Sequence, residues 1–357
     1  MKKIILIILL LTLSGCYDYK EINDLAIITA IGVDYKDEEY KITLEILNDQ
    51  NDKDSGKIKA YTKTGSDKSL AKALEEAADS LSDQANYTHV KLMILSDTIT
   101  DGRFASIIDF FMRSTYFREN FYVISSMNVE PEKILKNTTD NEPVASTSII
   151  NLLESLNYSS NSGVLKTFDQ IAEETLAFGK DTCFSNITLD DEEFKIDGLS
   201  IFDNYEYKDT ISNDYATIYN ILTNNFYRPI YSKIYDNLYF SIAITEGKAK
   251  IDANTKTIKL SGTLTGKIMD NEPNFIIRDL DVLKVLNNDF KSLINEKFKS
   301  FIEVLQENKS DILFLGESYY QKNREKEENF WIHADIDSDV NFYINKKGLI
   351  YEVQDEN

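Results

Sequence analysis

Residues that build most catalytic and metal sites are scarce in this sequence. Its 357 residues include 2 histidines, 2 cysteines and 1 tryptophan. His89 and His333 are far apart, and neither has a cysteine or another histidine at metal-ligand spacing, which disfavours a zinc site. Cys16 and Cys183 are too few for a disulfide framework. We therefore expect neither a metal nor another cofactor.

Motifs for nucleophilic catalysis and phosphate binding are also missing. There is no Gly-x-Ser-x-Gly elbow and no Gly-x-x-x-x-Gly-Lys-Ser/Thr loop. Asp335-x-Asp337-x-Asp339 imitates the start of a calcium loop. However, Val340 occupies the glycine position and Lys346 the position of the bidentate glutamate. Alternation on the solvated face of a strand accounts for the three aspartates.

The carboxylates do not single out an active site either. A pair suited to glycoside hydrolysis stays open in a chain with 60 Asp and Glu residues, but no pair stands out. We interpret Glu75-Glu76 and Glu173-Glu174 as solvated faces, and Cys183 as a small core residue. We predict a protein that is not an enzyme.

Basic residues are fewer than acidic residues in this chain. There are 39 Lys and Arg residues against 60 Asp and Glu, a formal net charge of −21. Such a surface repels phosphate groups, which disfavours nucleic acid as a partner and charge-driven docking on an anionic membrane. If the protein is held at a membrane, it therefore needs a hydrophobic or covalent anchor.

No apolar run reaches the roughly 20 residues that a membrane-spanning helix needs. The chain begins with Lys2 and Lys3, an aliphatic run at 4–11 and small residues up to Gly15, a layout that predicts a signal peptide over residues 1–15. The sequence LSGC at 13–16 resembles the lipobox of bacterial lipoproteins, which implies a diacylglycerol on the Cys16 sulfur and cleavage before it. Two acyl chains suffice for stable anchoring. The alternative is an ordinary secretory signal with an incidental cysteine.

Hydrophobic periodicity predicts an α+β protein in which helices cover mixed sheets in two or more subdomains. Hydrophobic residues make up 42% of the chain, which suits a folded core. In the first half we expect a hairpin turn at 34–39 between two strands and a β-β-α-β-α-β order before two further helices. The predicted strands are 25–33, 40–47, 90–95 and 121–125; the predicted helices are 69–81, 104–113, 146–157 and 167–178, the last with a capping box at Thr167 and Gln170 and Gly179 after its end.

The second half is predicted to contain strands and one long helix near the C-terminus. A boundary between about 189 and 213 gives an N-terminal domain over 16–195 and a C-terminal domain over 196–357. The predicted helices are 213–222 and 280–305, and the predicted strands are 238–245, 248–252, 257–267, 335–345 and 349–353.

Short motifs in a fixed order resemble the Ger(x)C, or GerAC-like, spore germination lipoproteins. They extend over essentially the whole chain, and their order makes the resemblance specific. The motifs are CYDYKEIND at 16–24 with GVD at 32–34, THVKLMIL at 88–95, DFFMR at 109–113 with Arg118, GLSIF at 198–202, DILFLG at 311–316, and Trp331 with Gly348.

The resemblance implies the C subunit of a nutrient germinant receptor. Such a subunit acts beside a multi-spanning A subunit and a transporter-like B subunit, lipid-anchored on the outer face of the inner spore membrane, and has no enzymatic activity. Within these motifs, His89, Arg113, Arg118 and Gly198 are candidates for structural or partner contacts, with internal ion pairing as the other interpretation of the arginines.

Two other classes stay open. One is a lipid-anchored solute-binding protein that captures a nutrient itself, and the other is a lipid-anchored hydrolase of the spore cortex. A ligand that binds the folded form alone raises its stability, which distinguishes the first from a receptor subunit.

Overall fold

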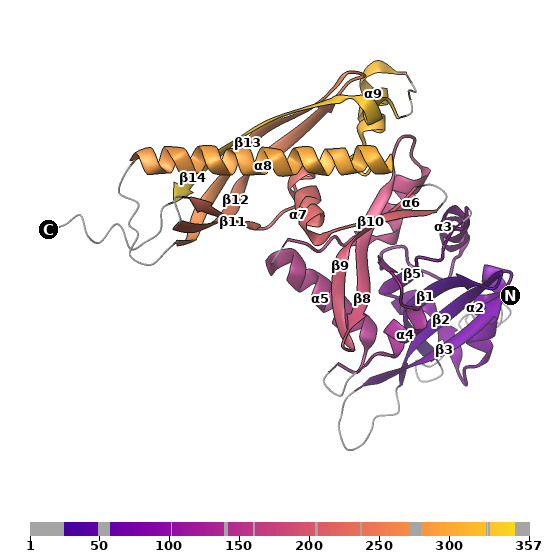
Figure 1. Ribbon diagram of the computed structural model, residues 1–357. Helices are drawn as coiled ribbons and strands as arrows, with labels where there is room; N and C mark the ends of the chain where they lie inside the picture. The colour runs from indigo at the N-terminus through magenta and orange to yellow at the C-terminus, as the bar shows by residue number, and fades with distance from the viewer. Residues whose placement is uncertain are drawn as a thin grey trace, which may run out of the picture.

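The computed structural model describes residues 25–48, 58–100, 102–138, 142–159, 161–203, 206–235, 238–271, 280–325, 327 and 329–346. Within these ranges, ten strands form one sheet and four strands form a second (Figure 1). Both sheets mix parallel and antiparallel pairs and are covered by helices, so the predicted α+β class is confirmed.

The first sheet has the order β10-β9-β8-β6-β5-β1-β2-β3, with β4 beside β1 and β7 beside β6. Its central strands β1, β5, β6 and β8 are parallel and β4 also pairs in parallel with β1, whereas β2, β3, β7, β9 and β10 pair in antiparallel. The strands are β1 (Leu25–Lys36), β2 (Glu39–Asn48), β3 (Lys59–Asp67), β4 (Gln84–Asn86), β5 (Leu92–Ser96), β6 (Tyr122–Ser126), β7 (Lys166–Thr167), β8 (Thr182–Asp190), β9 (Glu193–Phe202) and β10 (Tyr207–Ile211).

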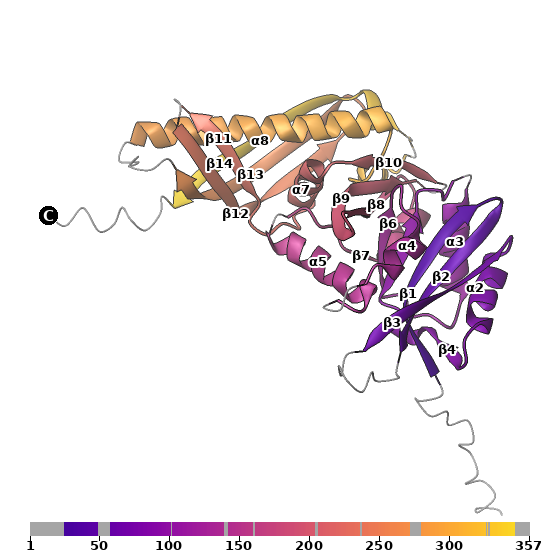
Figure 2. The same cartoon turned by 60° about the horizontal axis from the view of Figure 1, so that its bottom comes forward.

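Helices cover both faces of this sheet, as a buried parallel sheet requires. One face packs against α2 (Leu70–Asp79), α3 (Arg103–Arg113) and α6 (Phe168–Leu176). The other packs against α4 (Pro131–Lys136) and α5 (Ala145–Ser159), as Figure 2 shows from a second side. Alternation along β1 divides its residues between the two cores, since Ile31 and Val33 join the first core and Ala30 the second.

The second sheet has the order β11-β12-β13-β14 and carries one long helix. Helix α8 (Leu280–Asn308) packs along the sheet through a stripe that includes Phe290, Phe298 and Phe301. The remaining elements are β11 (Ile230–Tyr235), β12 (Leu238–Ala253), β13 (Thr257–Asn271), β14 (Asp335–Lys346), α7 (Asn213–Leu222), α9 (Leu315–Asn323), and the short 3-10 helices η2 (Tyr87–His89) and η3 (Phe330–His333).

Two asparagines of α8 bind the outer backbone of the edge strand β14. The Val340 N–H donates to Oδ1 of Asn295 over 2.8 Å, and the Ile344 N–H donates to Oδ1 of Asn287 over 2.8 Å. The two asparagines are eight residues apart in the helix, and the two N–H groups are four residues apart in the strand. Both separations correspond to roughly 12–13 Å, so helix and strand match in length between the two contacts. The helix therefore satisfies an edge that would otherwise be open to pairing.

Most predicted elements are present, with several differences. The turn predicted at 34–39 is confirmed, but it is shorter than predicted and consists of Asp37 and Glu38 alone. Both residues have positive φ, as a two-residue hairpin turn needs. The two strands predicted at 238–245 and 248–252 are one strand, β12. Thr245 forms a bulge in it, because the register against β13 shifts between Ile244 and Glu246 and leaves Thr245 without a partner residue on β13.

Other differences concern α6, residues 349–353 and the domain boundary. The capping box at Thr167 and Gln170 is present, but α6 ends at Leu176, so Gly179 lies in the following loop. The strand predicted at 349–353 lies outside the described residues. The first sheet continues to Ile211, so a division at 195/196 falls inside β9; the two-domain organisation stays a prediction.

Gly198 in β9 is required by close backbone packing against β10. It has φ +83°, and a Cβ at this position would lie 1.9 Å from the carbonyl oxygen of Ile211. Its N–H donates to Oδ1 of Asn213 over 2.8 Å. The position thus needs both a left-handed backbone and an absent side chain.

Replacing Gly198 with alanine is expected to lower the free energy of unfolding by more than about 3 kcal/mol, through the left-handed backbone and the clash together. Gly102 is the matched control, because it has φ +79° but no atom within 4 Å of its added Cβ. Gly102→Ala is expected to cost only about 1–2 kcal/mol. Urea unfolding of residues 17–357 measures both, and equal costs would contradict the close packing.

Candidate functional site

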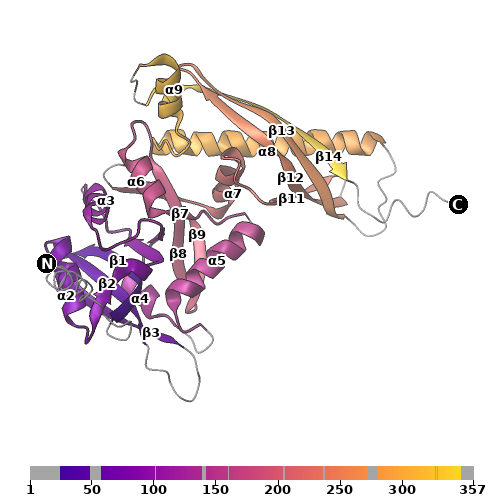
Figure 3. The same cartoon turned by 180° about the vertical axis from the view of Figure 1, so that it is seen from behind.

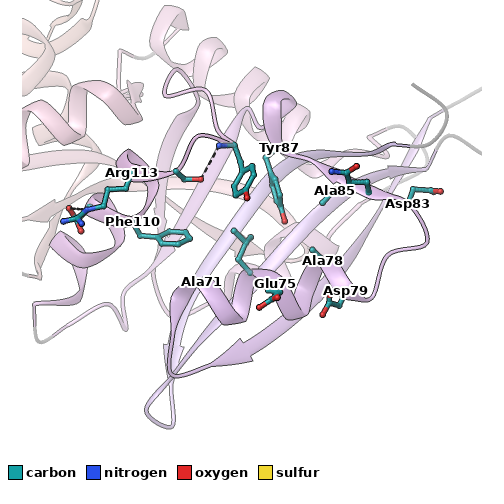
Figure 4. A pocket seen from close by; sticks show the side chains of 14 residues that line it. Ala71, Glu75, Ala78, Asp79, Asp83, Ala85, Tyr87, Phe110 and Arg113 are labelled. Carbon is teal, nitrogen blue, oxygen red and sulfur yellow. Dashed lines mark hydrogen bonds and ion pairs between the residues drawn. The ribbon is translucent and has the colours of Figure 1, made fainter. Parts of the chain in front are cut away.

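A groove of about 790 Å³ lies between α2 and α3 (Figure 4). This volume is in the range of binding pockets. Helix α2 comes close to the sheet because Gly65 of β3 has no side chain; a Cβ there would meet the backbone of Ala73 and Ala77 at 2.3 Å. The groove is lined by Ala71, Leu74, Glu75, Ala78, Asp79, Asp83, Gln84, Ala85, Tyr87, Asp109, Phe110, Arg113, Ser114 and Tyr116.

The floor of the groove is apolar and aromatic. Tyr87 is buried, and its ring lies 4.9 Å from that of Phe117 and 6.3 Å from that of Tyr116. Burial raises the pKa of Tyr87 to about 12, so its hydroxyl stays protonated at neutral pH. Tyr116 is 67% exposed, and the alanines of α2 present only methyl groups to the groove. The floor therefore offers apolar surface with few competing polar groups.

The rim of the groove is acidic. It carries the carboxylates of Glu75, Asp79, Asp83 and Asp109 and one guanidinium, that of Arg113. Nε of Arg113 binds Oδ1 of Asp109 at 2.9 Å, one helical turn away. Both side chains of this pair are mostly exposed, so water screens the attraction between them.

The groove adjoins the point where the described chain begins. Gln84 and Ala85, which line it, belong to β4, and they pair in parallel with Leu25 and Ala26 of β1. The first strand of the folded body therefore starts at the edge of the groove.

The structure places the sequence-predicted residues in different surroundings. Arg113 lines the groove and forms an internal ion pair, and His89 lies two residues from Tyr87 at the exposed end of η2. Arg118 is exposed in the loop before β6, and Gly198 belongs to β9. Neither of these two lines the groove. Cys16 lies outside the described residues.

A second polar cluster joins the two halves of the chain. Asp311 accepts hydrogen bonds from the N–H groups of Leu315 at 2.8 Å and Gly316 at 2.7 Å. Its own N–H donates to Oδ2 of Asp181 over 2.7 Å. Burial raises the pKa of Asp311 to about 7 and that of Asp181 to about 6.

One buried ion pair contradicts the solvated interpretation of Glu174. Its Oε2 binds Nζ of Lys166 at 2.7 Å and accepts a hydrogen bond from the Thr182 hydroxyl at 2.6 Å. Sequence periodicity did not indicate that a lysine would be buried here.

The interpretation of Cys183 as a core residue is confirmed, and burial raises the pKa of its thiol to about 11, which keeps it protonated and unreactive.

The three aspartates of the calcium-like motif lie on the exposed face of β14, as their alternation predicted. Oδ1 of Asp339 binds Nζ of Lys291 at 2.7 Å. Among the described residues, no three His, Cys, Asp or Glu side chains are grouped to hold a metal ion. No helix in the described ranges is long and apolar enough to cross a membrane.

The Asp181–Asp311 cluster predicts a pH-dependent contribution to stability. Both carboxyls bind their protons more tightly in the folded than in the unfolded chain, so their favourable contribution is complete below about pH 4 and is lost as the pH rises through about 6 and 7. The variant Asp311→Asn cannot titrate at this position. The unfolding free energy of the wild type minus that of Asp311→Asn is therefore expected to fall by about 2 kcal/mol between pH 5 and pH 8.

Urea unfolding of both proteins across this pH range measures the difference. Asp190→Asn at the exposed end of β8 is the control, and its difference from wild type is expected to stay constant. A difference for Asp311→Asn that does not change with pH would show that Asp311 is ionised throughout.

Comparison with known protein families gives two consecutive matches. The model described as "Spore germination protein N-terminal domain" matches residues 18–189. The model described as "Spore germination B3/ GerAC like, C-terminal" matches residues 197–348. Together they cover most of the chain in the order expected from its sequence motifs.

Individual proteins match over nearly the whole length. Spore germination protein KC of Bacillus subtilis (strain 168) is 21% identical, over 97% of this chain and 95% of its own. The putative spore germination protein YfkR of the same organism is 23% identical, over 87% of this chain and 85% of its own. The crystal structure of the GerBC protein is similar in fold, with a TM-score of 0.54 and 16% identity, over 88% of this chain and 96% of that chain.

Proposed function

Because the chain belongs to the GerAC-like family of spore germination proteins, we propose that it is the lipid-anchored C subunit of a nutrient germinant receptor. The observation that carries the proposal is that both family domains match in order over 18–189 and 197–348. A role in spore germination comes with the family. The receptor assignment, the membrane partners and the anchor are the proposal.

The anchor is proposed from the N-terminal sequence. Residues 1–15 form the signal peptide, Cys16 receives the diacylglycerol, and eight residues separate Cys16 from β1. The protein then resides on the outer face of the inner spore membrane. Tethering raises the effective concentration of the folded body beside the A and B membrane subunits without any added contact.

The proposed role is non-enzymatic. The thiol of Cys183 is buried, and the raised pKa keeps it protonated, which disfavours its use as a nucleophile. His89 and His333 end separate 3-10 helices in the first and second halves of the chain. The buried carboxylates Glu45 and Asp311 accept hydrogen bonds from backbone groups, which gives both a structural use.

The second candidate is a lipid-anchored solute-binding protein, and one cavity favours it. This cavity of about 330 Å³ has Lys166, Glu174 and Lys180 on its walls beside the ring of Phe314. A small zwitterion would suit such walls. However, Lys166 already pairs with Glu174, and Lys180 pairs with Glu317 at 2.9 Å, so a ligand would have to displace existing partners. Receptor assembly therefore ranks first.

Deletion of the gene is expected to abolish or strongly slow the loss of spore refractility in response to the nutrients of its receptor. The response to dodecylamine, which acts without receptors, is expected to stay intact. Light scattering of purified spores measures both. An unchanged response to every single and combined nutrient, in a strain without another copy of the gene, would refute the receptor assignment.

Cys16→Ala is expected to move the protein from the membrane fraction to the soluble fraction, in cells that lack the A and B subunits. Cys183→Ala is the matched control, because Cys183 is a buried core residue and its loss leaves the anchor in place. Immunoblots of fractionated cells measure the distribution. Retention of Cys16→Ala on membranes would rule out the lipid anchor.

A further inference from the structure

We propose that the groove between α2 and α3 binds a basic amphipathic helix from a membrane subunit of the receptor. The identity of the partner rests on the proposed function. The shape, charge and position of the groove carry the rest of the inference.

The floor of the groove fits the apolar face of a helix. Leu74 belongs to α2 and Phe110 to α3, and the ring of Tyr87 points toward α2 (Figure 4). Tyr116, which also lines the groove, is 67% exposed. Leu74 and Tyr87 are buried at the base of the groove, whereas Tyr116 and the half-buried Phe110 leave apolar surface open to a partner, and such surface marks interaction sites. In helix-in-groove recognition, residues spaced three and four apart along the ligand fill such a floor.

The rim favours a cationic partner. Glu75, Asp79 and Asp83 line the groove, Nζ of Lys72 binds Oε2 of Glu75 at 2.5 Å, and the guanidinium of Arg113 binds Asp109. The side chains of both ion pairs are mostly exposed, so water screens them and a cationic partner can replace them at little cost. Lysine or arginine side chains along the edges of an amphipathic helix would lie against these carboxylates and neutralise their mutual repulsion. The acidic rim would also speed the encounter with a basic segment.

The same charges disfavour the other occupants of an apolar groove. A second copy of this chain would bring a net charge of −21, and an anionic lipid surface would bring phosphates. The segment at 17–24 contains Asp18, Glu21 and Asp24 against a single lysine. It is therefore a poor match for the rim, although it adjoins the groove in sequence.

The position of the groove places it within reach of membrane subunits. The strand that begins nine residues after Cys16 pairs with β4, and β4 forms one edge of the groove. A fully extended segment of this length spans at most about 30 Å. A lipid on Cys16 would therefore hold the groove close to the outer ends of membrane-spanning helices.

Photocrosslinking in spores tests this proposal with the full-length lipidated chain. A benzoylphenylalanine replaces Ala78, which lines the groove, or Glu192, in the exposed turn between β8 and β9, as the control. The A and B subunits carry different epitope tags. We expect a crosslink to one tagged subunit from position 78 and none from position 192.

Charge-reversal variants then test whether the crosslink depends on the carboxylates of the rim or only on the net charge of the chain. Glu75→Lys with Asp79→Lys is expected to lower the crosslink from position 78 at least fivefold, and Glu75→Gln with Asp79→Asn is expected to have a smaller effect. Asp190→Lys with Glu193→Lys changes the net charge equally at the exposed ends of β8 and β9, and it is expected to leave the crosslink unchanged. Equal amounts of each variant in spore membranes show that the variants fold.

Two kinds of failure are distinguishable. The groove assignment is overturned if position 78 crosslinks to a second copy of this chain or to lipid, or if the crosslink persists in the charge-reversed rim variant. In either case, co-isolation of this chain with the tagged A and B subunits would still support the proposed function. If the wild-type chain co-isolates with neither tagged subunit, the proposed function and this inference both fail.

Discussion

One hydrophobic core holds the two sheets of this protein together, and the placement of the two halves of the chain relative to each other depends on it. Cys183, Leu199 and Ile201 of the first sheet pack in the same buried cluster as residues of α7, β12–β14 and α8. Helix α7 contacts β9, β12 and α8. The two halves therefore share buried apolar surface, which opposes their independent movement. As a result, α2, which lines the groove, lies at one end of the molecule and α8 with its sheet at the other (Figure 3).

Polar contacts reinforce this junction in a small area. A Cβ on Gly179 would lie 3.0 Å from the backbone of Gly316, so the two loops approach as closely as glycines allow. Asp181 and Asp311 bind each other's backbone across the same loops, and Lys180 pairs with Glu317. The junction therefore combines a close approach of the two chains with buried carboxyls, whose ionisation makes its strength depend on pH.

Sequence periodicity was sufficient for elements whose partners lie nearby or whose pattern is long. The apolar stripes of α3 and α8 and the capping box of α6 identified these helices. In contrast, β3 has no clean alternation, since its place at the sheet edge depends on pairing with β2 and on the approach of α2 to Gly65. Glu45 is buried because Ser146, about a hundred residues later, brings the start of α5 over it. Such burial is set by tertiary structure and leaves no local pattern.

The candidate groove shows the same limit. Arg113 and His89 were identified through motifs, and the structure brings Arg113 to the groove rim. The floor, however, arises because α2, η2 and α3 meet over one face of the sheet, and no spacing within any single element indicates this. The acidic composition of the chain predicted that it would repel nucleic acid and anionic membrane surfaces. The structure adds the position of an apolar groove with an acidic rim, which we propose as the binding site of a cationic partner.

The central claim is that this chain is one subunit of a membrane receptor, and its mass in the native state tests this most directly. The complex would be isolated from spore membranes in mild detergent through a tag on this chain and analysed by native mass spectrometry. We predict a species that contains this chain together with two different membrane-spanning subunits. A mass that corresponds to this chain alone, with its lipid, would contradict the account.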